Sequence, residues 1–201
     1  MKICLINPRF PLSLWDFSYS RDIDGNVFPF PTLSLATLAA LTPGEHEVVI
    51  CDENIKPVDF DTDADIVGIT GYHIQKERVY QLADLFRSKG KTVAIGGPLV
   101  QKSNLGECAE HADVVFLGEA EYTWPSFIHD FQSGNAQPLY VQDGFVDLAA
   151  SPAPRFELLE LSAYSTAIIE TSRGCPHSCE FCEIPIRLGK RPRNKSVEQV
   201  M

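Results

Sequence analysis

Residues 65–98 read DIVGITGYHIQKERVYQLADLFRSKGKTVAIGGP and alternate between strand and helix patterns. Residues 65–70 and 92–95 are short runs rich in Val and Ile, which favour strands. Between them, residues 75–89 carry an apolar stripe at i, i+3, i+4 and i+7, made of Val79, Leu82, Ala83 and Phe86. A strand, a helix and a second strand in this order predict a βαβ unit with parallel strands.

The same alternation extends over the first two thirds of the chain. Further strands are expected at residues 2–7, 46–51 and 114–117, and further helices at residues 32–41, 100–110 and 122–132. The five strands are nearly continuous apolar runs, as expected when helices cover both faces of a sheet. Residues 1–134 are therefore predicted to form an α/β domain with a doubly wound, Rossmann-like parallel sheet, which binds ligands at the carboxyl ends of its strands.

The pattern changes after residue 134. Residues 135–165 contain the turn-forming pairs Gln137-Pro138 and Asp143-Gly144, and they are predicted to form a linker. Residues 167–171 resume a strand pattern that leads directly into a cysteine-rich loop. Residues 166–201 are therefore expected to begin a second domain.

Composition restricts the classes of function. The 201 residues carry a formal net charge of −10, which argues against a general nucleic-acid-binding role. No stretch approaches the roughly 20 apolar residues of a membrane span. The apolar run at the start of the chain is too short for the apolar region of a signal peptide. The chain is therefore expected to be cytoplasmic, where its six cysteines indicate metal binding or catalysis before disulfides.

Three of these cysteines, Cys175, Cys179 and Cys182, form a CxxxCxxC pattern. Thiolates ligate iron–sulfur clusters, and three of them can hold three irons of a [4Fe–4S] cluster. The fourth iron then stays open to chelate the amine and carboxylate of S-adenosylmethionine (SAM). Electron transfer into the sulfonium yields a 5′-deoxyadenosyl radical. Phe181 is expected to place its ring beside the bound cofactor.

Other interpretations of the cysteines remain. A zinc site with His177 as a further ligand is one, although the second ligand pair typical of such sites is missing. A ferredoxin-type cluster is another, but no distant cysteine lies in a suitable loop. A chance group of structural thiols is the third. Cys4, Cys51 and Cys108 fall within expected strands or helices and are interpreted as buried small apolar residues.

Residues 171–182 resemble the cluster loop of the radical SAM superfamily. In that family the loop follows the first strand of a (β/α) barrel, so the resemblance implies that residues 168–171 are this strand and that the barrel is truncated here. Three stretches further resemble the cobalamin-binding domain of cobalamin-dependent radical SAM enzymes, namely Ile69-Thr70-Gly71, Ala94-Ile95-Gly96-Gly97-Pro98 and Leu117-Gly118-Glu119-Ala120-Glu121. Pro152-Ala153-Pro154-Arg155, Ser172-Arg173-Gly174-Cys175-Pro176 and Gly189-Lys190-Arg191-Pro192-Arg193 resemble the branch that includes hopanoid methylases.

The resemblance implies a cobalamin site at the strand ends. The residues expected to contact it are Asn7, Thr70, Gly71, Gly96, Gly97, Gly118 and Glu119. The Asp-x-His-x-x-Gly motif that places histidine on cobalt in other cobalamin proteins is missing, and His73 lacks that pattern. Cobalamin is therefore expected to bind without a protein imidazole on cobalt.

The implied activity is methyl transfer from methylcobalamin to an unactivated carbon of a small-molecule or lipid-like substrate. A reducing partner such as flavodoxin or ferredoxin is expected to supply electrons. Two alternatives stay open. One is a radical SAM enzyme of different chemistry without bound cobalamin, and the other is a non-catalytic fragment that binds cobalamin or an iron–sulfur cluster.

Overall fold

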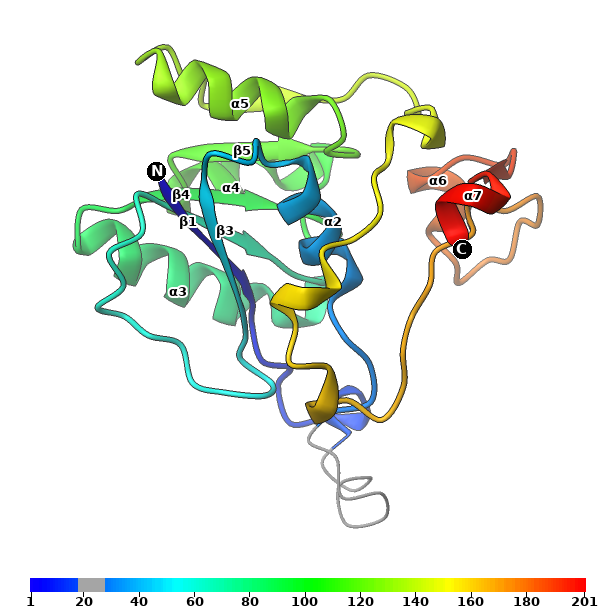
Figure 1. Ribbon diagram of the computed structural model, residues 1–201, viewed down its shortest axis with the longest axis horizontal. Coiled ribbons are helices and arrows are strands. Elements are labelled where there is room, and N and C mark those ends of the chain that lie inside the picture. Colours follow the sequence, from blue (N-terminus) through cyan, green and yellow to red (C-terminus); the bar gives the residue numbers. More distant parts are fainter. Residues whose placement is uncertain (18–27) are drawn as a thin grey trace.

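A computed structural model describes residues 1–17 and 28–201 and contains a six-stranded, fully parallel sheet (Figure 1). The strands are β1 (Lys2–Asn7), β2 (Glu47–Asp52), β3 (Ile66–Thr70), β4 (Thr92–Gly96), β5 (Val114–Leu117) and β6 (Leu139–Val141). Their order across the sheet is β2-β1-β3-β4-β5-β6. The order reverses direction at β1, as in doubly wound Rossmann-like sheets, so the predicted α/β class is confirmed.

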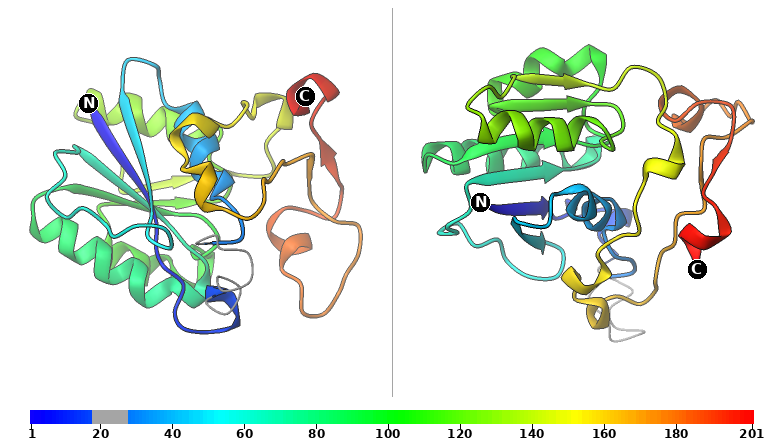
Figure 2. Two further views of the ribbon diagram at one scale, coloured as in Figure 1. Left: turned by 60° about the horizontal axis from the view of Figure 1, so that its bottom comes forward. Right: turned by 45° about the horizontal axis from the view of Figure 1, so that its top comes forward.

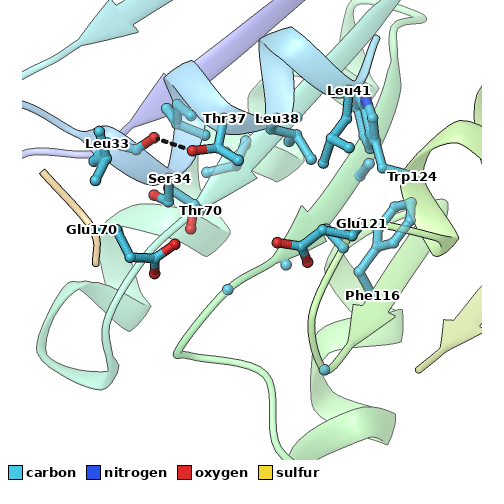
Figure 3. Close-up of a pocket in the computed structure, with 18 of the residues that line it drawn as sticks. Leu33, Ser34, Thr37, Leu38, Leu41, Thr70, Phe116, Glu121, Trp124 and Glu170 are labelled. Carbon is cyan, nitrogen blue, oxygen red and sulfur yellow. Dashed lines mark hydrogen bonds between the residues drawn. The ribbon is translucent and has the colours of Figure 1, made fainter. Parts of the chain in front are cut away.

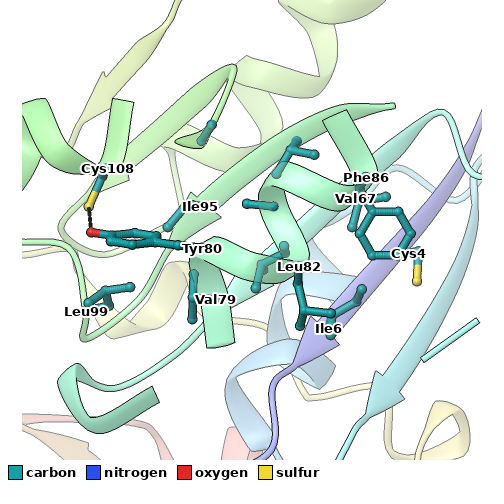
Figure 4. Close-up of a cluster of buried hydrophobic side chains, with 14 of the residues drawn as sticks. Cys4, Ile6, Val67, Val79, Tyr80, Leu82, Phe86, Ile95, Leu99 and Cys108 are labelled. Carbon is teal, nitrogen blue, oxygen red and sulfur yellow. Dashed lines mark hydrogen bonds between the residues drawn. The ribbon is translucent and has the colours of Figure 1, made fainter. Parts of the chain in front are cut away.

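Helices cover both faces of this sheet (Figures 1 and 2). They are α2 (Leu33–Leu41), α3 (Lys76–Ser88), α4 (Leu105–His111) and α5 (Thr123–Gln132). Alternate residues of β1 point to opposite faces: Cys4 and Ile6 pack with α3 and α4, whereas Ile3 and Leu5 pack with α2 and α5. Figure 4 shows the predicted stripe of α3 against the strands, with Phe86 fully buried.

The sixth strand was not predicted, because it lies within residues 135–165, which the sequence assigned to a linker. β6 has three residues and pairs parallel to β5, with Tyr140 opposite Phe116. The Tyr140 ring stacks on Phe116 with 5.4 Å between ring centroids, and its hydroxyl donates to Asp130 Oδ2 at 2.8 Å. Aromatic packing and this hydrogen bond stabilise a strand that is too short to give a clear periodicity in the sequence.

The expected first barrel strand is absent from the described part of the chain. Residues 167–171 form no strand, although the Thr171 carbonyl accepts a hydrogen bond from the Lys195 N–H at 2.9 Å. They lead instead into β7 (Ser172–Arg173), which pairs antiparallel with β8 (Arg193–Asn194). Two short helices, α6 (Ile184–Arg187) and α7 (Val197–Val200), complete this segment, and a (β/α) barrel is not confirmed.

Residues 166–201 lie beyond the carboxyl ends of the sheet strands (Figure 2, orange to red). Residues 150–165 reach this position by crossing the α2 side, where the Arg155 backbone N–H donates to the Ala36 carbonyl at 3.0 Å. The buried Tyr164 hydroxyl then donates to Asp52 Oδ2 at 3.0 Å, at the end of β2. In the described residues, no helix has the length and apolar character needed to cross a membrane.

Candidate functional site

A cavity of about 390 Å³ opens at the carboxyl ends of the central strands, between α2, α5 and the C-terminal segment (Figure 3). Its walls are mostly apolar. The residues that matter below are Leu33, Leu38, Leu41, Thr70, Gly96, Gly97, Phe116, Gly118, Glu121, Trp124, Glu170, Arg173 and Leu188. A concave apolar site with a few polar groups is the usual form of a small-molecule or cofactor pocket.

Gly68 lies in the cavity wall and packs closely against its neighbours. At Gly68 in β3, a Cβ would lie 2.9 Å from Leu5 Cδ2 and 3.6 Å from the Trp124 ring, so larger side chains do not fit there. The Trp124 indole is fixed, because its Nε1–H donates to Thr42 Oγ1 at 2.9 Å. The ring of Trp124 therefore forms a rigid wall whose hydrogen-bond donor is already satisfied inside the protein.

Four of the predicted contact residues, Thr70, Gly96, Gly97 and Gly118, do meet at this cavity. The structure gives Gly97 an internal reason to be glycine. Its φ is +81°, and a Cβ would lie 2.2 Å from Thr70 Oγ1. Gly118 has a φ of +98°, and a Cβ there would be 3.1 Å from the Gln142 carbonyl oxygen. These glycines let neighbouring loops approach one another, so their presence alone does not indicate a ligand.

Two other predicted contact residues do not line the cavity. The Gly71 carbonyl accepts a hydrogen bond from the Leu99 N–H at 2.7 Å, and a Cβ at Gly71 would collide with Val79 Cγ2 at 2.7 Å. The loop after Asn7 turns toward β2 instead, where the Asn7 carbonyl accepts from the Glu53 N–H at 2.9 Å. His73 is exposed and is not part of the cavity wall.

Glu119, also predicted as a cofactor contact, has its carboxylate committed to arginines. Arg173 Nη1 lies 2.8 Å from Glu119 Oε1, and Arg193 Nη1 lies 3.0 Å from Glu119 Oε2. Burial acts to lower the pKa of Arg173, but hydrogen bonds to Glu170 and Glu119 outweigh it and raise that pKa. Burial likewise acts to raise the pKa of Glu170, and Arg173 and Lys195 lower it overall. Arg173 and Glu170 therefore both stay charged.

The three cysteines of the CxxxCxxC loop are free thiols at or near the surface. Cys179 is exposed, and Cys175 and Cys182 are half-buried. The Cys182 N–H donates to the Cys179 carbonyl at 3.0 Å, which forms a turn between these two. Phe181 is 91% exposed. In residues 1–17 and 28–201, no three His, Cys, Asp or Glu side chains are gathered as a metal site.

The remaining cysteines are buried, as predicted. Burial raises the pKa of Cys4 to about 12 and that of Cys51 to about 11. Cys108 is fully buried, with its sulfur 3.5 Å from the Tyr80 hydroxyl (Figure 4). Thiols held in this protonated form are poor metal ligands and poor nucleophiles.

Several site residues were missed by sequence reasoning. Leu33, Leu38 and Leu41 line the cavity from α2, and Glu121, Trp124, Glu170, Arg173 and Leu188 line it from later segments. One signal was present: α2 reads LSLATLAAL and is apolar on nearly all sides, which is typical of a helix covered on more than one side. The pairing of Arg173 with Glu119 and Glu121 gave no such signal, because it joins segments that are far apart in the sequence.

Comparison with known proteins connects the chain to methyltransferases. It is 33% identical to an uncharacterized methyltransferase of Synechocystis sp. over 100% of this chain and 38% of that protein. It is 33% identical to the bacteriochlorophyllide d C-8(2)-methyltransferase of Chlorobaculum tepidum (86% of this chain, 40% of that protein) and 32% identical to the hopanoid C-2 methylase of Rhodopseudomonas palustris (100% and 39%). No family model matches the chain. The chain spans about two fifths of the length of these relatives.

Proposed function

We propose that this chain supplies the cofactor-binding part of a cobalamin-dependent radical SAM methyltransferase. One observation carries the proposal. The cavity at the carboxyl ends of the strands is lined by Glu170, Arg173 and Leu188, and these residues flank the CxxxCxxC loop on both sides. A cofactor in the cavity and a cluster on the loop would therefore be neighbours. Similarity to methyltransferases over the whole chain supports methyl transfer.

The donor set of the loop fits a [4Fe–4S] cluster that keeps one iron open. It offers three thiols within eight residues, and they are the accessible thiols, since Cys4, Cys51 and Cys108 are buried. Residues 176–181 around them are exposed. Cys175, Cys179 and Cys182 would be the ligands.

The cavity fits part of a large, flat cofactor. Its volume of about 390 Å³ would take one end of a cobalamin molecule, and its open side at the strand ends leaves space for the corrin. Leu38, Phe116 and Trp124 would contact apolar parts, while Glu121 would accept hydrogen bonds and the Thr70 hydroxyl would accept or donate them. His73 lies outside the cavity wall, in agreement with the proposal that no protein imidazole binds cobalt.

With both groups bound, the cluster would supply the electron that cleaves SAM, and methylcobalamin would supply the methyl group. The residues of this chain position the two groups and exclude water. Apolar side chains from α2 and the Trp124 ring would shield a bound group from water, and the paired charges would hold the cysteine-bearing segment beside the cavity.

Anaerobic reconstitution with iron and sulfide, followed by hydroxocobalamin, tests the proposal. We expect roughly four irons and four sulfides per chain and a bound corrin with unsplit cob(II)alamin lines in the electron paramagnetic resonance spectrum. Cys179→Ala should abolish iron uptake, whereas Cys51→Ala, which removes a buried thiol, should not. Zinc in place of iron would exclude the cluster. Iron uptake without hydroxocobalamin binding would favour the cobalamin-free radical SAM enzyme.

A further inference from the structure

Six charged residues form one network between the sheet domain and the cysteine-bearing segment, called here the junction network. Its members are Glu119, Glu121, Glu170, Arg173, Arg193 and Lys195. Arg173 lies at the centre, with Nη1 2.8 Å from Glu119 and 2.7 Å from Glu121, and with Nε 2.8 Å from Glu170. Three carboxylates face three cations, so the network is balanced in charge.

Several side chains of the junction network are buried, so each of these charged groups needs its partner within hydrogen-bond distance. The Glu119, Glu121 and Lys195 side chains are 6%, 3% and 4% exposed, and Arg173 is 13% exposed. Arg193 donates hydrogen bonds to both carboxylate oxygens of Glu119, from Nη1 to Oε2 at 3.0 Å and from Nη2 to Oε1 at 3.1 Å. A buried ion pair is costly to break from one side, because the partner is left as an uncompensated charge. Glu119 therefore holds β7 through Arg173 and β8 through Arg193.

The position of Cys175 follows from these two strands. Gly174 has a φ of +92°, and a Cβ there would lie 2.7 Å from the Arg191 carbonyl oxygen, so its backbone packs directly on residues 188–191. The Cys175 N–H donates to the Gly189 carbonyl at 3.0 Å. Gly189 in turn packs beneath the Phe145 ring, which also stacks on the Arg193 guanidinium at 5.1 Å.

The network is also part of the cavity wall. Glu121, Glu170 and Arg173 line the cavity, and Figure 3 shows the carboxylates of Glu121 and Glu170 directed toward one another across it. A molecule in the cavity would therefore touch Arg173 or its partners. The same arginine precedes Cys175 by two residues.

We propose that Glu119 is a positioning residue that fixes Cys175 beside the cavity, so that an occupied cavity and a cluster on the cysteine loop stabilise each other. The inference rests on the proposed function for the identity of the two groups. Both groups favour the same arrangement of β7 and β8, and such a coupling between two sites is reciprocal.

The first test needs no cofactor. In a Cys179→Ala, Cys182→Ala background, Cys175 is the one cysteine that is not buried, so its rate of alkylation by iodoacetamide can be followed. Adding Glu119→Gln should raise that rate several-fold, because β7 and β8 lose their common anchor. Glu107→Gln is the matched control, since it breaks the Lys76–Glu107 pair on α3 and α4, away from the junction. Equal rates in all three proteins would overturn the positioning role.

The second test measures coupling with hydroxocobalamin as the probe. In the otherwise unaltered protein, the Kd should be at least about fivefold lower after iron–sulfur reconstitution than before it. Glu119→Gln should bring the ratio of the Kd before reconstitution to the Kd after it close to one. Arg193→Gln, which leaves the Arg173 pairs intact, should reduce it, and Glu107→Gln should keep it. Circular dichroism verifies that each variant is folded.

The outcomes separate the two proposals. Binding of hydroxocobalamin with the same Kd before and after reconstitution overturns the coupling alone. A ratio unchanged by Glu119→Gln overturns the role of Glu119. No binding in either state overturns the cobalamin function together with the coupling, while the alkylation rates still decide whether Glu119 positions Cys175.

Discussion

At the scale of single residues, the glycines show how one pattern can have two causes. Gly96 and Gly97 were expected to contact a bound cobalamin. In the structure Gly97 is needed because its φ is +81° and because Thr70 Oγ1 would be 2.2 Å from a Cβ. A bulky residue there would disrupt the loop whether or not a cofactor binds, so substitution of Gly97 is a poor test of cobalamin binding.

Gly97→Ala is instead predicted to destabilise the cofactor-free protein. Left-handed backbone costs a non-glycine residue about 1–2 kcal/mol, and the collision with Thr70 adds about 1–3 kcal/mol of overpacking. Gly90→Ala is the matched control, since Gly90 has a φ of +76° and nothing within 4 Å of a Cβ. Urea unfolding should therefore show a larger loss of unfolding free energy for Gly97→Ala. Equal losses would mean that the Thr70 contact relaxes without cost.

A second prediction at this scale concerns the pH dependence of Glu53, whose side chain is 7% exposed beside Arg78. Burial acts to raise the pKa of Glu53, but Arg78 and the Arg9 N–H outweigh it and hold that pKa below 4.5. A lowered folded pKa gives stability that is present above the unfolded pKa and is lost as the pH falls through the folded value.

Glu53→Gln should therefore lower the unfolding free energy at pH 7 by about 1–3 kcal/mol, and this difference should shrink below pH 4.5. Urea denaturation at pH 7 and at acidic pH measures it. Glu77→Gln, at an exposed position of α3, should change little at either pH. A difference that grows on acidification would reverse the assigned direction of the pKa.

At the scale of secondary-structure elements, helices and strands with a clear apolar pattern were predicted accurately from the sequence. A short strand that depends on pairing with its neighbour was not. The stripe of Val79, Leu82 and Phe86 located α3, and continuous apolar runs located β1 to β5. β6 was missed because three residues after Pro138 carry no period, and their strand depends on Phe116 beside them. Residues 167–171 have the composition of a strand, which predicted one there, but the described chain forms no strand at these positions.

α2 carries the prediction at this scale, because it forms one wall of the cavity. Leu38→Phe should enlarge a side chain that lines the cavity and weaken hydroxocobalamin binding at least tenfold, about 1.4 kcal/mol. Leu85→Phe makes the same change at a 39% exposed position of α3 on the opposite face of the sheet. It should leave the Kd unchanged. Equal affinity of both variants would place the corrin outside this cavity.

At the scale of the whole molecule, ion pairs and hydrogen bonds connect the sheet domain to the C-terminal segment. The junction network joins them at β7 and β8, and the Gln199 amide of α7 donates to the Leu148 carbonyl at 2.9 Å. The glycine loops of the site could be predicted, since each follows a strand. The junction could not, because long-range ion pairs depend on the folded arrangement and leave no pattern in the sequence.

This arrangement predicts an uneven pattern of amide hydrogen exchange across the C-terminal segment. Amides with partners, such as Cys175 with Gly189 and Lys195 with Thr171, should exchange slowly, while the exposed residues 176–181 should exchange fast.

Arg193→Gln removes one anchor of β8 and leaves the Arg193 partner Glu119 buried and less compensated, so protection at residues 172–175 and 193–195 should fall together. Protection of β1 and β3 at the centre of the sheet should not change, which makes these strands the internal control. Exchange followed by mass spectrometry on the wild type and this variant measures both. Uniformly fast exchange over residues 172–195 in the wild type would show that the junction network does not hold the cysteine loop against the sheet domain in solution.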